Sequence, residues 1–261
     1  MNPISGATGP NRSNDVDDHS RETAPQKREL DSSALPMVHR GAADLAAIAR
    51  NLVQHGVETV GREKISSSAS TSHAYGTEAE ARTAFASQAK KLADVSQWTT
   101  LSGRENAKFD LFDRTGAPVS GRSASAGDFV RVQLPGQKQY DWVRVEDVSV
   151  GADRVGIRVR PTFDPTKRPP TPDVVAHFFT RETTNTFLIE RNGTSVTARV
   201  EGRDESANVG ERAGGLENAV RNRAACEGAW GIRRTIPGTT IEVNGLQQHQ
   251  WNVFTENLVK P

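Results

Sequence analysis

The sequence has almost no cysteine, and its apolar residues form no long runs. Cys226 is the single cysteine among 261 residues, which excludes an intramolecular disulfide and a CxxC metal site. No apolar run approaches the roughly 18 residues of a membrane-spanning helix, and the first 30 residues lack the apolar core of a Sec signal peptide. We therefore expect no membrane span.

Motifs for the common cofactors are also missing. The phosphate-binding patterns GxxxxGK[ST] and GxGxxG do not occur, and neither does the GxSxG pattern of α/β-hydrolases. The six histidines are scattered and never take HExxH spacing. The sequence therefore predicts no metal site and no cofactor.

Charge is nearly balanced, with 33 Lys and Arg against 32 Asp and Glu. Such a balance argues against a protein that binds nucleic acid or membranes over its whole surface, and leaves local patches as the means of binding anions. The basic residues are 25 arginines and 8 lysines. This ratio suits a GC-rich bacterial genome, or a protein that avoids ubiquitin-acceptor lysines in a eukaryotic cytosol.

Residues 1–76 have the composition of a disordered leader. They are rich in Ser, Asn, Asp, Thr, Pro and small residues, with Tyr75 as the lone aromatic, so they bury too little surface to offset the entropy of ordering. A short amphipathic helix is expected near 41–60, where Leu45, Ile48, Leu52 and Val53 share one face. Residues 65–76 are expected to form a Ser-rich linker.

Residues 77–261 are expected to form a globular domain that folds without the leader. Thr77 and Glu80 make a capping box for a first helix, and two more helices are expected over 215–229 and 245–259, the last with Asn244 as N-cap. Between them the hydrophobic period changes to two in six segments: KFDLFDR, DFVRVQL, YDWVRVEDVSV, RVGIRVR, NTFLIER and TSVTARV.

The expected fold class is α+β. The strands cluster in the sequence and do not alternate with helices, which favours a mostly antiparallel sheet or partly open barrel of about six strands flanked by helices. The clearest pairing joins the last two segments across Asn192-Gly193, a dipeptide that favours a type I′ hairpin turn.

Alternation along three strands predicts a basic sheet face. If the valines of DFVRVQL, YDWVRVEDV and RVGIRVR face the core, the opposite face carries aromatic and basic side chains: Phe129, Arg131, Trp142, Arg144, Arg158 and Arg160. Arginine forks bind anions and aromatic rings stack on bases, so we take Arg131, Trp142, Arg144, Arg158 and Arg160 as the candidate binding residues. The alternative is a solvated face with Arg–Glu pairs through Glu146.

Cys226 is the candidate nucleophile for an enzyme, with His177 or His249 as its base. It falls late in its expected helix and within an Ala-rich stripe, where a small buried thiol is the usual finding. His177 lies among hydrophobic neighbours in DVVAHFF, which is typical of a core histidine with a hydrogen-bond partner.

The opening MNPISGATGPNR has no acidic residue before Asp15, one aliphatic residue, Ile4, and otherwise small and polar residues. It resembles the export signal of type III secreted effectors of plant-pathogenic bacteria. The resemblance implies secretion into a host cell, with a secretion chaperone binding the helix near 41–60; the alternative is an ordinary disordered tail on a protein of the bacterial cytoplasm. The segments GDFVRV, YDWVRVEDV, GIRVRP and DVVAHFF also resemble an uncharacterised group of small bacterial proteins, which implies no activity.

Three functional hypotheses follow from the sequence. The first is a translocated effector whose α+β domain binds a host protein or an anionic ligand in the host cell. The second is an enzyme of unrecognised class. The third is a bacterial module that binds anions or single-stranded nucleic acid through the Arg and aromatic face.

Overall fold

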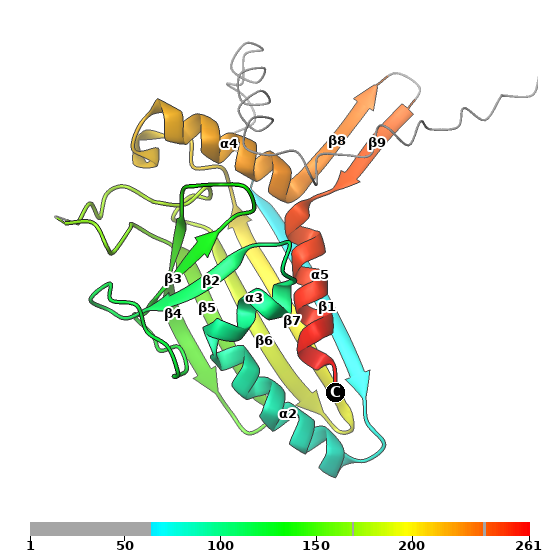
Figure 1. The fold of residues 1–261 in the computed structure, drawn as a ribbon. Helices are drawn as coiled ribbons and strands as arrows, with labels where there is room; N and C mark the ends of the chain where they lie inside the picture. The colour runs from blue at the N-terminus through cyan, green and yellow to red at the C-terminus, as the bar shows by residue number, and fades with distance from the viewer. Residues whose placement is uncertain (1–63, 169, 237–238) are drawn as a thin grey trace, which may run out of the picture. The chain divides into compact units, whose positions relative to one another are not determined.

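The computed structural model describes residues 64–168, 170–236 and 239–261. The leader up to residue 63, including the helix expected near 41–60, lies outside the described residues. Seven antiparallel strands form an open sheet in the order β1-β7-β6-β5-β4-β3-β2, so β1 and β2 are its edges (Figure 1). The fold class is therefore α+β, as predicted, with an open sheet and not a closed barrel.

All six strands expected from the period-two segments are present. They are β2 (Lys108–Phe112), β3 (Phe129–Gln133), β4 (Asp141–Val150), β5 (Arg154–Pro161), β6 (Thr184–Asn192) and β7 (Ser195–Glu205). The β6–β7 hairpin is confirmed, but its turn is not type I′. Asn192 is the last residue of β6, paired with Ser195, and within this turn Gly193 alone has a positive φ, of 57°.

The seventh strand, β1 (Ile65–Ala74), corrects the prediction of a Ser-rich linker over residues 65–76. It pairs with β7 from Ile65 opposite Glu205 to Ala74 opposite Ser195. Its small side chains allow close approach of the last helix, α5 (Leu246–Val259), where the hydroxyls of Thr71 and Thr255 lie 2.9 Å apart. Composition alone suggested a linker because an edge strand of this kind buries few large apolar side chains.

Helices cover one face of this sheet. Figure 1 shows α2 (Glu78–Ala93), α3 (Trp98–Ser102) and α5 in front of the strands, with the 3-10 turn η2 (Val95–Gln97) between the first two. The Thr77–Glu80 capping box at α2 is confirmed, with both of its hydrogen bonds formed. Gly245 and not Asn244 is the N-cap of α5.

The core lies between these helices and the sheet. It contains the valine face predicted from alternation, including Val130, Val143 and Val145, together with large aromatic rings. Trp98 lies at its centre, with its ring 4.4 Å from that of Phe187 and 5.9 Å from that of Phe254. The aromatic rings thus close the inner face of the sheet.

The remaining elements lie between β7 and α5 in the sequence. A 3-10 turn, η3 (Glu211–Ala213), precedes α4 (Leu216–Trp230), which matches the helix expected over 215–229. Leu216 is 80% exposed, because the buried side of α4 is formed by residues 222–226. A separate two-stranded sheet, β8 (Gly231–Ile236) with β9 (Thr239–Asn244), was not predicted.

We predict that a fragment of residues 64–261 unfolds cooperatively and that a fragment of residues 77–261 does not. Removing β1 leaves one edge of β7 unpaired and Glu205 without the Ser67 hydroxyl, a loss comparable with the roughly 5–15 kcal/mol that stabilises a typical domain. Urea unfolding followed by circular dichroism measures both. Equal midpoints for the two fragments would show that β1 is dispensable.

Candidate functional site

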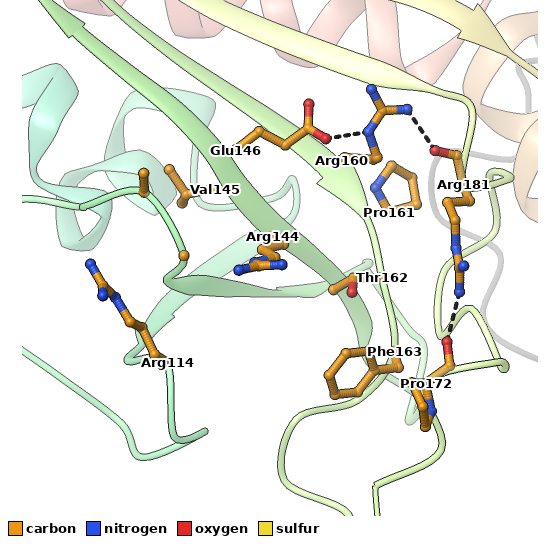
Figure 2. A pocket seen from close by; sticks show the side chains of 12 residues that line it. Arg114, Arg144, Val145, Glu146, Arg160, Pro161, Thr162, Phe163, Pro172 and Arg181 are labelled. Atoms are coloured by element: carbon orange, nitrogen blue, oxygen red, sulfur yellow. Dashed lines mark hydrogen bonds and ion pairs between the residues drawn. The ribbon is translucent and has the colours of Figure 1, made fainter.

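A hollow of about 630 Å³ lies on the face of the sheet opposite the helices (Figure 2). Its floor is made by β4 and β5, where Arg144, Glu146 and Arg160 alternate with core valines. The loop of residues 113–128 forms one wall, and residues 161–181 form the other. In Figure 2, Arg114 lies on one side, Pro172 and Arg181 lie on the other, and Arg144 is between them.

The first wall is held by a buried aspartate. Asp128 is 2% exposed and receives two hydrogen bonds from the Arg122 guanidinium, at 2.6 and 2.9 Å. The bonded carboxylate raises the pKa of Arg122 above its ordinary value. The Gly127 amide donates to the Val145 carbonyl at 2.8 Å, which fixes the loop against β4.

Gly127 has a direct role in placing Arg114. Its φ is 95°, and a Cβ at this position would come within 3.2 Å of the Arg114 Nε and 3.4 Å of the side-chain carbons. The backbone conformation therefore favours glycine, and a Cβ here would also shift the arginine stem that crosses it. The loop presents the Arg114 guanidinium at the rim of the hollow.

The second wall is attached to β4 by main-chain hydrogen bonds. The Thr162 amide donates to the Trp142 carbonyl, and the Trp142 amide donates to the Ala176 carbonyl, at 2.9 and 2.7 Å. The two walls also meet at one end. A Cβ on Gly116 would lie only 2.4 Å from the Pro165 carbonyl oxygen, so the two loops approach closely here. Arg168 also donates to the Thr115 carbonyl at 2.9 Å.

The arginines of the hollow fall into two groups. Arg160 is fully engaged: it binds Glu146 and donates to the main-chain carbonyls of Arg181 and Glu182 at 2.8 and 3.2 Å. Arg181 donates to the Pro172 carbonyl at 2.6 Å. These two side chains build the wall.

Arg114 and Arg144 form the second group. Both are exposed, and neither makes an ion pair or a side-chain hydrogen bond with any residue that the structure describes. Arg144 is the direct cross-strand partner of Arg160, and like charges in this position repel. Glu146 is already shared by Arg158 and Arg160. The hollow therefore holds cationic charge that its own carboxylate does not balance.

The structure brings together two of the five candidate binding residues, Arg144 and Arg160, in the hollow. Arg158 is half-exposed beside it and binds Glu146 at 3.2 Å. Arg131 binds Asp110 at 2.9 Å and lies over the Tyr140 ring, 4.3 Å from its centroid. Neither Arg131 nor Arg158 lines the hollow.

The aromatic residues of this face are not a stacking platform. Trp142 is 2% exposed and Phe129 is 5% exposed, because Phe163 and Ala176 pack against their cluster. They form a small cluster with Phe112, against which Phe163 and Ala176 pack. The expectation that Trp142 binds a ligand is therefore corrected: its ring supports the second wall from below.

Sequence reasoning missed Arg114 and Arg181, because both lie in loops where alternation gives no orientation. The available signals were the glycines at 116 and 127, which mark positions of close approach. They indicate loops with a defined backbone conformation, but not which side chain packs across them.

Cys226 and His177 are both buried near α4. The Cys226 thiol donates to the Phe178 carbonyl at 3.3 Å, and burial raises its pKa well above the ordinary value, so the reactive thiolate is disfavoured. His177 accepts a hydrogen bond from the Phe179 amide at its Nδ1 atom, at 2.9 Å. Burial lowers the pKa of His177 to about 4. Both groups behave as parts of the core, as the sequence favoured.

Among the residues that the structure describes, no group of three or more His, Cys, Asp or Glu side chains is placed to hold a metal ion. The helices in this part of the chain include none that is long and apolar enough to cross a membrane.

No protein-family model matches this sequence, and no curated protein matches it. Among solved structures, a hypothetical protein of Helicobacter pylori is similar over 76% of this chain and 88% of its own, with 11% identity and a TM-score of 0.44. The extracellular domain of PknH from Mycobacterium tuberculosis has 10% identity over 62% of this chain and 57% of its own, with a TM-score of 0.29. The major latex-like protein 151 of Panax ginseng has 12% identity over 62% of this chain and 97% of its own, with a TM-score of 0.30.

We predict that His177 makes the protein less stable in acid. Its pKa is about 4 in the folded state against 6.5 for a free imidazole, so below pH 6.5 the unfolded chain binds the proton first. The stabilisation is complete above pH 6.5 and is lost as the pH falls to 4, by about 3 kcal/mol at about 1.36 kcal/mol per pKa unit.

Urea unfolding of His177→Asn between pH 7 and pH 4 measures this contribution. The variant keeps an acceptor for the Phe179 amide but cannot titrate, so its stability should fall less steeply than that of the wild type. His249→Asn, which removes an exposed imidazole of α5, is the control. Parallel curves for wild type and His177→Asn would contradict the assignment.

Proposed function

We propose that this protein is a binding domain whose outer-face hollow receives an anionic group of a partner molecule. The observation that carries the proposal is that Arg114 and Arg144 both line one hollow and neither has a carboxylate partner among the described residues. Holding two such cations beside the engaged Arg160 costs electrostatic free energy, which a bound anion offsets.

The dimensions and walls of the hollow support this proposal. Its volume of about 630 Å³ lies within the range of roughly 300–1,000 Å³ that ligand sites commonly have. The first wall is held by the Arg122–Asp128 ion pair and the second by main-chain hydrogen bonds, so the backbone that surrounds the hollow is fixed before a ligand binds.

The enzyme hypothesis gains less support. Cys226 is buried with its pKa raised, and His177 is held neutral in the core, so the candidate nucleophile and base have no access to a substrate. A nucleic-acid module is also disfavoured, since the rings expected to stack on bases are covered.

The binding proposal predicts that inorganic phosphate occupies the hollow. Titration of isotope-labelled protein with sodium phosphate, against sodium chloride at equal ionic strength, should shift the NMR signals of the Arg114 and Arg144 Nε–H groups and of the Gly127 amide. Arg144→Glu should weaken phosphate binding at least ~10-fold, because it replaces a charge-assisted donor by a repelling carboxylate. It should change the unfolding free energy by less than about 1 kcal/mol.

Arg203→Glu is the matched control. Arg203 lies on β7, its side chain is 69% exposed, and it is outside the hollow. Arg221 would be an unsuitable control. It binds the buried Asp141, so a charge reversal there would destabilise the fold. Phosphate binding that is equal in wild type and Arg144→Glu would contradict the proposal.

We further propose that the domain acts in a host cell after type III secretion. The support is the low-charge, small-residue opening MNPISGATGPNR and its resemblance to export signals. A secretion chaperone binding near residues 41–60 belongs to this proposal.

Fusion of residues 1–60 to a reporter tests the export step. The fusion should reach host cells from bacteria with an intact type III system and stay inside a secretion-deficient strain. Deletion of residues 2–30 should abolish transfer. Equal transfer from both strains, or no transfer from either, would contradict export by this route.

A further inference from the structure

A second, smaller hollow adjoins the first. It has a volume of about 330 Å³ and is lined by residues of the segment 175–182 and of the segment 208–212. Arg181 lines both hollows, so the two are neighbours at this side chain. The Pro172 carbonyl accepts a hydrogen bond from Arg181 at 2.6 Å, which holds the shared side chain in place. A ligand that reaches beyond the first hollow in this direction meets Arg181 and then the residues of the second hollow.

The two hollows differ in charge. In the first, Glu146 binds Arg158 and Arg160, which leaves Arg114 and Arg144 without a carboxylate partner among the described residues. In the second, Arg181 and Arg212 stand against Glu182 and Glu211. The cationic charge is thus concentrated at one end, and the other end is mixed.

This gradient discriminates between classes of anionic ligand. A nucleic-acid strand carries a phosphate at every nucleotide, so its continuation would place phosphates beside Glu182 and Glu211. A small anion such as a free carboxylate would fill only part of the first hollow. A ligand with one concentrated anionic group and a polar, weakly charged continuation matches both hollows.

The number of unopposed guanidinium groups favours a dianion over a carboxylate. A phosphorylated side chain carries roughly −1.5 to −2 charges at pH 7 and three acceptor oxygens, so it can bind two arginine forks at once. An Asp or Glu side chain would leave part of the charge of Arg114 and Arg144 unbalanced. Phosphorylated peptides are commonly recognised by such arginine clusters.

Building on the anion-binding function proposed above, we propose that the ligand is a phosphorylated peptide segment of a partner protein. Its phosphate binds between Arg114 and Arg144, and the residues that follow it lie along Arg181 and enter the second hollow. Arg212, at the far end, contacts these following residues and not the phosphate.

Fluorescence anisotropy with the full-length protein tests this inference. The probes are labelled pools of short randomised peptides with a fixed phosphoserine, phosphothreonine or phosphotyrosine, and the same pools with the unmodified residue or with glutamate. At least one phosphorylated pool should bind ~10-fold or more tightly than its unmodified and glutamate counterparts. Its affinity should also exceed that of inorganic phosphate, measured by competition against the labelled pool.

Two variants separate the ends of the site. Arg144→Glu should abolish binding of both phosphopeptide and inorganic phosphate. Arg212→Glu should weaken phosphopeptide binding several-fold and leave the phosphate titration unchanged, since Arg212 lines the second hollow and not the first. Arg203→Glu should behave as the wild type in both assays.

The possible outcomes distinguish this inference from the function on which it rests. Phosphate binding in the hollow without tighter binding of any phosphopeptide overturns the peptide inference and leaves the anion site intact. Equal binding of the glutamate and phosphorylated pools overturns the inference that the site prefers a dianion. An oligothymidylate that binds more tightly than every phosphopeptide pool overturns the peptide inference in favour of a nucleic acid. Failure of both phosphate and phosphopeptides to bind overturns both proposals.

Discussion

The outer face of the sheet depends on one buried carboxylate, that of Asp141 at the start of β4. It is fully buried, and it accepts hydrogen bonds from the Phe178 amide at 3.0 Å and from both terminal nitrogens of Arg221 at 2.6 and 2.5 Å. These contacts join β4 to α4 and to the end of the segment that forms the second wall of the hollow. A buried ion pair of this kind adds little net stability over an apolar core, but removing one partner leaves a charge without compensation, at a cost of about 3–5 kcal/mol. Asp141 thus fixes the geometry of the outer face more than it raises the stability of the domain.

The inner face of the sheet follows the opposite principle. There Trp98, Phe187 and Phe254 fill the space between helices and strands, and specificity comes from the shapes of rings. One polar group in this region is Glu205, which is fully buried where β1, α4 and α5 meet and accepts hydrogen bonds from Ser67, Trp230 and Gln247. Burial raises the pKa of Glu205 despite these donors, which makes its ionised form less favourable than in water. Its hydrogen bonds nevertheless fix how β1, α4 and α5 meet. With the inner face closed by rings, the larger hollow lies on the outer face.

The sequence predicted the strands and the orientation of their side chains, because period-two alternation follows directly from strand geometry. It therefore placed Arg144 and Arg160 on the face opposite the valines correctly. Alternation gives the side of a sheet and not what covers it, so Trp142 was expected to be accessible, whereas residues 162–176 lie over it. The strand β1 was missed because the side that it turns inward carries mostly small residues, Ser67, Ala69 and Thr71, and gives no run of large apolar side chains. Arg114 and Arg181 could not be placed, since their positions come from loop contacts between residues far apart in the chain.

The electrostatics of the hollow follow from the register of two strands. Because Arg144 and Arg160 are paired directly across β4 and β5, a single carboxylate on this face cannot neutralise both, and a bulge between Val145 and Asp147 brings Glu146 to Arg158 and Arg160. The register thus directs the acid to the arginines on β5 and leaves the one on β4 uncompensated. An anion that enters the hollow supplies the missing negative charge in the folded state alone, so its binding must also raise the stability of the domain by mass action. The strand pairing that builds the sheet thus leaves Arg144 without a carboxylate partner among the described residues, and the proposed anion site rests on this feature.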